Sequence, residues 1–271
     1  MRWVTFSPGR RGSLLLGAAP LLVLALGYVI ASAARHAENP ADKILPLPGA
    51  MATAMAGLLF QADPLSGQYL FWADTLASLT RLGMGLGIAT LSALLVGLVL
   101  GALPPVRATL GPLVTAIAVI PPVALLPILF IVFGLGETAK VALIVIGIAP
   151  FMIRDIAGHI TALPREQVVK ALTLGANSWG VVLRVALPQA LPRLVEALRL
   201  SLGPAWVFLI SAEAIAADVG LGYRIFLVRR YLAMDVILPY VAWIALLAVA
   251  MDFILTRGSR RLFGWAHLGA R

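Results

Sequence analysis

The chain has 271 residues, of which 61% are hydrophobic and only 12% are charged, whereas ordinary soluble domains carry about 25% charged residues. A water-soluble core cannot bury this apolar excess, so the composition excludes an ordinary soluble domain and predicts a membrane protein. The formal net charge of +9 does not indicate nucleic-acid binding, because the arginines lie singly or in pairs at the edges of apolar runs, and the absence of cysteine excludes disulfides and thiolate sites.

Six segments are apolar enough to cross a membrane as helices of roughly 20 residues, so we predict an all-α integral membrane protein. They are 13–34, 82–103, 110–133, 139–160, 191–216 and 238–255. The first follows Arg10 and Arg11 and ends near an Ala-Ser-Ala sequence, which also fits a signal peptide with a cleavage site. Its apolar region exceeds the roughly 7–15 residues of a signal core, so an uncleaved span is favoured.

The polar stretch 35–81 separates the first two predicted spans, and its portion 68–80 is predicted to form a surface helix leading into the membrane. The second span is rich in glycine, which favours close packing against another helix. These glycines are Gly83, Gly85, Gly87, Gly97 and Gly101.

The third predicted span is interrupted by Pro121, Pro122 and Pro127. Proline frees backbone carbonyls, and within a membrane neighbouring helices or water must satisfy them. We therefore expect this span to be buried inside the bundle.

Six spans place both ends of the chain on one side of the membrane. Lysine and arginine favour the cytoplasmic side, and the predicted inner segments hold 14 of the 21 basic residues. They are Arg2, Arg10, Arg11, Arg107, Arg154, Arg165, Lys170, Arg184, Arg193, Arg199, Arg257, Arg260, Arg261 and Arg271. The tails 1–12 and 256–271 are therefore predicted to be cytoplasmic, and 35–81 to be periplasmic.

The inner loop 161–190 is too polar to cross the membrane, yet it has a helical pattern. Pro164 can begin a helix and Gly175 can end it. Asn177 or Ser178 can then cap a second helix.

The second helix of the loop is predicted to be amphipathic, with an apolar face formed by Trp179, Val182, Leu183, Ala186 and Leu187. Pro188 and Pro192 are expected to end it and redirect the chain into the fifth span. Such a helix either rests its apolar face on lipid or inserts into a groove on a soluble partner. The pattern alone does not separate these alternatives.

The spacing within the loop favours the partner. Gly175 is followed nine residues later by Val185-Ala186-Leu187-Pro188, and Val169-Lys170-Ala171 precede Gly175 by three residues. This segment resembles the cytoplasmic loop of bacterial ABC importer permeases, which carries Glu-Ala-Ala, three residues, Gly, nine residues and Ile-x-Leu-Pro. The Gly and Leu-Pro parts are intact, but the Glu is missing, and Glu166 lies one turn earlier.

Further motifs between about residues 45 and 230 are similar to the nitrate, sulfonate and taurine permease group. They are Leu47-Pro48, Ser78-Leu79-x-Arg81, Ile120-Pro121-Pro122-x-Ala124-Leu125-Leu126-Pro127, Phe133-Gly134-Leu135-Gly136-Glu137, Ala205-Trp206, Ala212-Glu213 and Gly220-Leu221-Gly222-Tyr223.

The resemblance implies a type I importer fold with a core at 82–255, and a bacterial inner-membrane subunit that is not an enzyme. Two permease chains, here expected to be a homodimer, form the pathway for a small anion such as nitrate, a sulfonate or taurine. A periplasmic binding protein delivers the solute. Two separate ATPase subunits bind ATP and Mg, because this chain has no Gly-x-x-x-x-Gly-Lys-Ser/Thr loop; no cofactor, metal site or catalytic residue is expected in it.

The resemblance also implies which residues contact the ATPase. They are Val169, Lys170, Ala171, Gly175, Ala176, Trp179, Leu183, Val185, Leu187 and Pro188.

Charged residues inside the predicted spans are costly and often functional. Glu213 lies in an apolar run, where it either lines the pathway together with Trp206 and Ser211 or has a buried partner. Asp252 is expected to pair with Arg257. Near the end of the fourth span, an interfacial ion pair is expected within Arg154, Asp155 and His159.

Two other functions stay open. An ion-coupled transporter or channel would need no ATPase, and the loop spacing would then be accidental. An intramembrane enzyme is disfavoured, because neither His-Glu-x-x-His nor Gly-x-Ser-x-Gly occurs.

Overall fold

The computed structural model describes residues 9–64 and 66–267, and every element in these ranges is helical. Residues 1–8 and 268–271 of the two predicted tails, including Arg2 and Arg271, lie outside the described residues. The chain divides into two units. Unit 1 comprises the chain up to Tyr69 and Val228–Tyr240, and unit 2 comprises Leu70–Leu227 and the chain from Val241 onward.

Unit 1 contains α1 (Arg10–Glu38), α2 (Pro48–Phe60), the short turn Arg229–Tyr231 and the start of α11 (Met234–Leu262). The predicted first span lies within α1. The loop after α1 folds back on it, because the Tyr28 hydroxyl donates to the Pro46 carbonyl at 2.7 Å and the Ser32 hydroxyl donates to the Leu45 carbonyl at 2.9 Å. In this loop the Arg35 guanidinium holds the pKa of the Asp42 carboxyl below its ordinary range.

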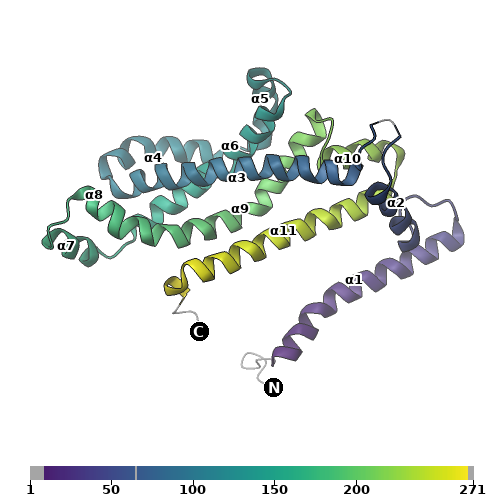
Figure 1. Cartoon of the computed structure of the whole chain (residues 1–271), viewed down its shortest axis with the longest axis horizontal. Coiled ribbons are helices and arrows are strands. Elements are labelled where there is room, and N and C mark those ends of the chain that lie inside the picture. The colour runs from purple at the N-terminus through teal and green to yellow at the C-terminus, as the bar shows by residue number, and fades with distance from the viewer. Residues whose placement is uncertain (1–8, 65, 268–271) are drawn as a thin grey trace. The chain divides into compact units, whose positions relative to one another are not determined.

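Unit 2 holds the remaining elements, which are drawn as ribbons in Figure 1. They are α3 (Leu70–Ala102), α4 (Pro104–Val119), a 3₁₀ turn (Pro122–Leu125), α5 (Leu126–Phe133), α6 (Glu137–Thr161), α7 (Arg165–Thr173), α8 (Ser178–Val181), a π-helical turn (Val182–Ala186), α9 (Leu187–Ala216), α10 (Leu221–Val228), most of α11 and a 3₁₀ turn (Gly264–His267).

Five described helices are long and apolar enough to span a membrane, or six if the bent pair α4 and α5 counts as one span. This agrees with the six spans predicted from the sequence. The boundaries differ most at α3, which begins at Leu70 and runs for 33 residues through Arg81 without a break. The predicted surface helix 68–80 is therefore the first part of α3.

The third predicted span breaks at its prolines, where the axes of α4 and α5 differ by 89°. The 3₁₀ turn joins the two helices at this bend, and within it the Ala124 N–H donates to the Pro121 carbonyl at 3.0 Å. The expectation of burial is wrong for α4, which has no buried residue within this chain. The bundle core is already filled by α3, α6 and α9.

The core of unit 2 is built on the contact between α3 and α6, with α9 packed against both (Figure 1). Small residues make this contact close: Gly85, Ala89, Ala93, Gly97 and Gly101 recur every four residues, so they share one face of α3. A Cβ added to Gly85, Gly97 or Gly101 would lie within 3.0 Å of an isoleucine of α6. The prediction of close packing is confirmed for these three glycines, whereas Gly83 and Gly87 face open space.

Gly97→Ala should lower the free energy of unfolding by about 1–3 kcal/mol, because its Cβ would meet the Ile156 Cβ at 2.9 Å and overpack the interface. Gly87→Ala on the same helix is the matched control and should be neutral or slightly stabilising, since nothing lies within 4 Å. Thermal unfolding in detergent measures both. Equal melting temperatures would show that α3 and α6 do not pack as closely as described.

Candidate functional site

The inner loop 161–190 folds as the short helix α7 and the first turns of a second, longer helix, at one end of unit 2 that we call the loop end (Figure 1). α7 begins after Pro164 and ends in a left-handed turn at Gly175, whose φ is +87°. The Gly175 N–H donates to the Leu172 carbonyl and the Ala176 N–H to the Ala171 carbonyl, both at 3.0 Å. This pair of bonds is the Schellman pattern, so Gly175 ends α7 as predicted.

Gly175→Ala should destabilise this turn by about 1–2 kcal/mol, because an L side chain is strained at positive φ. Gly158→Ala, at a helical position in α6 with no atom within 4 Å, is the control and should not destabilise. Hydrogen exchange of the α7 and α8 amides measures the effect. Unchanged protection in Gly175→Ala would contradict the strain.

The second loop helix begins as predicted at the Asn177 cap, whose Oδ1 accepts from the Gly180 N–H at 2.7 Å. The predicted stop at Pro188 and Pro192 is wrong. From Ser178 the chain stays helical for 39 residues to Ala216, with both prolines near the start of α9. A π-helical turn just before Pro188 widens the helix, in which the Leu187 N–H reaches the Val182 carbonyl, and this accommodates proline without ending the helix.

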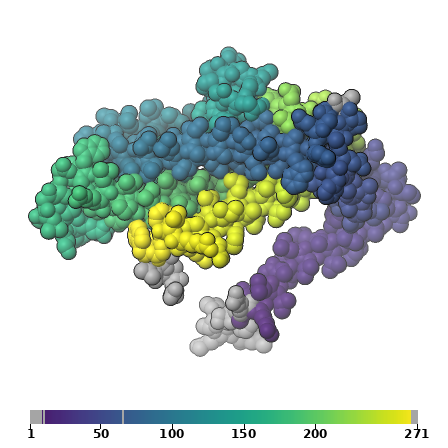
Figure 2. All heavy atoms as spheres, in the orientation of Figure 1, coloured from purple at the N-terminus to yellow at the C-terminus, as the bar shows by residue number. Residues whose placement is uncertain are grey.

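Large apolar side chains of the loop stand exposed. Trp179 is 64% exposed and Leu183 57%. Val169, Leu172 and Leu174 add to this set, which we call the loop patch. Figure 2 shows the loop as the green lobe at one end of unit 2, with nothing of unit 2 covering its outer side. An apolar cluster of this size on a segment too polar to enter the membrane marks an interaction surface.

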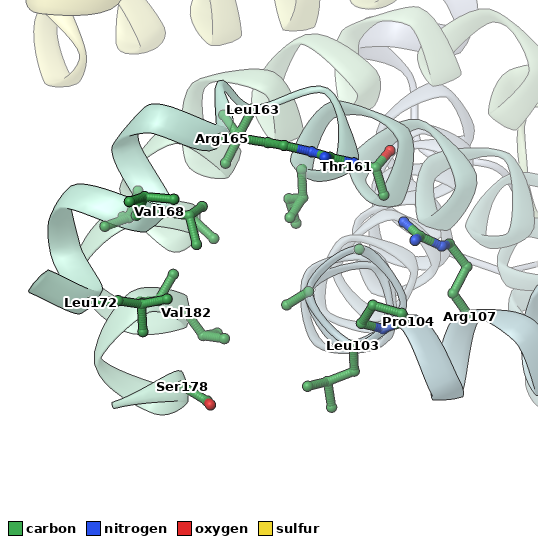
Figure 3. Close-up of a pocket in the computed structure, with 17 residues that line it drawn as sticks. Leu103, Pro104, Arg107, Thr161, Leu163, Arg165, Val168, Leu172, Ser178 and Val182 are labelled. Atoms are coloured by element: carbon green, nitrogen blue, oxygen red, sulfur yellow. The ribbon is translucent and has the colours of Figure 1, made fainter. Parts of the chain in front are cut away.

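The ten residues that the resemblance implicates in coupling do not share one environment. Val169, Lys170, Gly175, Trp179, Leu183 and Pro188 are exposed, while Ala171, Ala176, Val185 and Leu187 are half-buried. Val185 faces inward, where it lines a cavity of about 600 Å³ between the loop and the adjoining ends of α3, α4 and α6 (Figure 3). Val169 also lines this cavity, so the other five exposed residues form the outer surface of the loop.

A buried ion network occupies the opposite end of unit 2, which we call the network end. The Glu213 side chain on α9 is fully buried and accepts from the Arg81 Nη1 of α3 at 2.7 Å. The Ser78 hydroxyl lies 2.7 and 2.9 Å from its two carboxylate oxygens, and the Gly222 N–H donates at 2.9 Å. The structure therefore gives Glu213 the buried partner that was one of its two predicted alternatives.

Arg81 joins three elements, because it also binds the Glu137 carboxylate at the start of α6 and the Val219 carbonyl at 2.7 Å. Glu137 accepts in addition from Lys140 at 2.8 Å. The Arg81 side chain is only 4% exposed, so its charge depends on these carboxylates for compensation.

The segment between α9 and α10 is fastened to α3 by the same network. The Gly220 N–H donates to Asp74 at 2.9 Å, and the Leu221 N–H donates to the Ser78 hydroxyl at 2.8 Å. Arg224 binds Asp74 at 2.8 Å. A side chain at Gly220 would collide with Glu213 and Arg81, so glycine is required where the backbone passes over this pair.

Four of the sequence motifs quoted for the permease group meet in this network. The motifs contribute Ser78 and Arg81, Glu137, Glu213, and Gly220–Gly222, which lie far apart in the chain. Each motif supplies at least one hydrogen-bond partner. The pairing itself was not predicted. The signal available in the sequence was that isolated charges recur in these motifs beside apolar runs.

The other predicted pathway residues lie on α9. Trp206 is 4% exposed, and its Nε1 has no hydrogen-bond partner among the described residues. The Ser211 hydroxyl donates to the Val207 carbonyl at 2.7 Å on a less buried face. Ser211, unlike Trp206 and Glu213, therefore lies where solute or a partner can reach it.

Two predicted ion pairs are replaced by others. Asp252 of α11 binds Arg199 of α9 at 2.8 Å and not Arg257, so this pair links two helices of unit 2. Asp155 binds Arg193 at 2.7 Å, so the pair near the end of α6 joins α6 to α9 and does not include Arg154.

The length of α3 between the two ends of unit 2 fits one crossing of a membrane. Arg81 and Gly101, at the network end and the loop end of α3, are 20 residues apart, which is about 30 Å along a helix. This matches the thickness of a hydrocarbon core, near 30 Å.

Residues 85–264 match the model of a protein family described as binding-protein-dependent transport system inner membrane component. The chain is 39% identical over 155 residues to the taurine transport system permease protein of Escherichia coli (strain K12), covering 57% of this chain and 56% of that one. It is 32% identical over 203 residues to a probable ABC transporter permease protein of Brucella melitensis, covering 74% and 81%. A nitrate import permease protein of Synechococcus elongatus is 32% identical over 152 residues, covering 56% and 54%.

The matched region thus spans just over half the length of the taurine and nitrate relatives. Among solved structures, the inward-facing MetNI methionine ABC transporter has a chain with a TM-score of 0.60 at 22% identity, covering 72% of this chain and 95% of that one. A bacterial alginate ABC transporter, in complex with a periplasmic protein bound to an alginate pentasaccharide, gives 0.60 at 15% identity, covering 92% and 97%. At these identities the likeness shows a shared fold.

Proposed function

Because the chain belongs to the family of binding-protein-dependent transport system inner membrane components, we propose that it is the permease subunit of an ABC importer. In this role it supplies part of the membrane pathway and no catalytic chemistry. ATP is hydrolysed by a separate subunit, and a periplasmic binding protein delivers the solute.

The loop patch is the observation that carries this proposal. It presents exposed apolar side chains, among them Trp179 and Leu183, on a segment whose turn is fixed by Gly175 and whose second helix is capped by Asn177. A helix with an apolar outer face suits insertion into a groove of a soluble protein. We assign that groove to the ATPase, because the Gly175 to Pro188 spacing agrees with the family's coupling loop.

This assignment puts the loop end on the cytoplasmic side and the network end on the periplasmic side. Because six spans leave both ends of the chain on one side, the distribution of basic residues makes both termini cytoplasmic as well. The distribution of basic residues supports the same orientation, since Arg107, Arg154, Arg165 and Arg184 all lie at or near the loop end.

A second copy of the chain would complete the pathway. Within this single chain the spanning window of α1 has no buried residue, and that of α11 is only 11% buried, so both helices keep large apolar surfaces for lipid or another chain. The relatives named for taurine and nitrate transport support a small anion as the solute.

Transport in reconstituted vesicles tests the function. The chain would be co-expressed with a candidate ATPase and a candidate binding protein and placed in proteoliposomes with labelled taurine or nitrate. Uptake should require ATP, the ATPase and the binding protein together. Uptake by the permease alone, driven by an ion gradient or by diffusion, would favour the transporter or channel alternative and contradict the proposal.

A further inference from the structure

A second hollow at the loop end lies outside the coupling surface. It has a volume of about 310 Å³, and helices α3, α4 and α6 line it. Its charged lining residues are Arg107 of α4 and Arg154 of α6, and Thr115 and Thr161 add hydroxyl groups. Its volume falls within the roughly 300–1,000 Å³ of small-ligand sites.

Neither arginine forms an ion pair within the described part of the chain. Among residues 9–64 and 66–267, no carboxylate lies within 4.0 Å of the guanidinium of Arg107 or Arg154. The neighbouring Asp155 is bound to Arg193 at 2.7 Å. Two arginines that face one cavity without an acid between them create a positive potential that favours an anion.

A third arginine strengthens this potential from the adjoining cavity. Arg107 and Thr161 line both hollows, and the larger one also contains Arg165 at the start of α7. In Figure 3 the guanidinium ends of Arg165 and Arg107 both extend toward Thr161. Like charges repel when they are gathered in this way, so their grouping is most stable with an anion present.

The position of the hollow indicates which anion. It lies where α3 and α6 end and α4 begins, at one edge of the membrane-spanning length of the bundle. Its lining combines the arginines with Leu100 and Val114, and the next turns of α4 expose Leu110 and Leu113 at 44% and 57%. A charged hollow that opens beside exposed apolar residues suits a molecule with an anionic head and an apolar tail.

We propose that Arg107 and Arg154 bind the phosphate group of an anionic membrane lipid, with Arg165 contributing from the adjoining cavity. Guanidinium groups form charge-assisted, often bidentate bonds to phosphate, and basic pockets between spanning helices are suited to lipid head groups. The bound lipid neutralises the hollow and fills the space between α4 and α6. This site does not depend on docking of the ATPase.

Native mass spectrometry of the full-length chain in a nonionic detergent tests the site. Phosphatidylglycerol is the probe, phosphatidylcholine is the zwitterionic comparison, and inorganic phosphate represents a free anion. Phosphatidylglycerol should bind in preference to phosphatidylcholine. Arg107→Gln and Arg154→Gln should each weaken its binding about fivefold, and the double variant about twentyfold. Arg107→Lys and Arg154→Lys should retain most of the affinity.

Arg260→Gln is the matched control, because Arg260 is exposed on α11 and lines neither cavity. It should leave lipid binding unchanged. The two pocket arginines are exposed, so their substitution should not alter the melting temperature, which checks folding. Equal losses in Arg260→Gln and the pocket variants would overturn the proposal. So would a site that binds inorganic phosphate without preferring phosphatidylglycerol over phosphatidylcholine.

Discussion

Replacing Arg81 with methionine should lower the free energy of unfolding by about 3–5 kcal/mol, the usual cost of removing one partner of a buried ion pair. The reason is that Glu213 is fully buried and would lose the Nη1 donor at 2.7 Å, which leaves the carboxyl group without a charge partner. Glu137 would lose its Arg81 contacts as well but is 58% exposed, so water can compensate it. Denaturant or thermal unfolding in detergent measures the loss.

Arg199→Met is the matched control, since Arg199 also pairs across helices of unit 2, with Asp252 at 2.8 Å. The two side chains of that pair are 30% and 46% exposed, so the loss should stay below about 1 kcal/mol. The double variant Arg81→Met with Glu213→Met should recover part of the loss, because no uncompensated carboxylate is then left buried. Similar losses from the two single arginine variants would show that burial does not set the strength of the network.

Replacing Trp179 with alanine should weaken binding of the partner ATPase by about 2 kcal/mol or more, roughly thirtyfold in Kd, if the proposed docking is correct. Trp179 is 64% exposed and packs against little of its own chain, so the melting temperature of the isolated permease should not change. Loss of affinity without loss of stability is the signature of an interface residue. Titration of the purified ATPase against the permease in detergent measures it.

Trp265→Ala is the control for this variant, because Trp265 is also exposed, at 53%, but lies on the turn after α11 and outside the loop. ATPase affinity should be unaffected. An intact, fully coupled complex formed by Trp179→Ala would remove Trp179 from the docking surface.

Features set by neighbouring residues could be predicted from the sequence. The spans follow from apolar runs of the right length, and the turn at Gly175 and the cap at Asn177 follow from residues that act within one helical turn. The helix end predicted at Pro188 was wrong, although that prediction also rested on neighbouring residues. A π-helical turn accommodates this proline without ending the helix, and no residue type in the sequence indicates such a turn.

Features set by distant residues could not be predicted. Arg81 and Glu213 are 132 positions apart, so neither sequence neighbourhood reveals the other. The second span was expected to begin at residue 82, directly after the charged Arg81. In the structure Arg81 is buried and paired, so α3 can include it and begins at Leu70. The pairing of Asp252 with Arg199 was missed for the same reason, since Arg257 was nearer in sequence but not in space.

The uninterrupted helical stretch from Ser178 to Ala216 has a mechanical consequence. Trp179 near its beginning and Glu213 near its end are 34 residues apart on one hydrogen-bonded rod, about 50 Å long. A displacement at one end of this helix is therefore transmitted to the other end, and the helix is weakest at the π-helical turn and at the internal prolines Pro192 and Pro204. Such a displacement would act on the segment between α9 and α10, which Glu213 and its neighbours bind to α3.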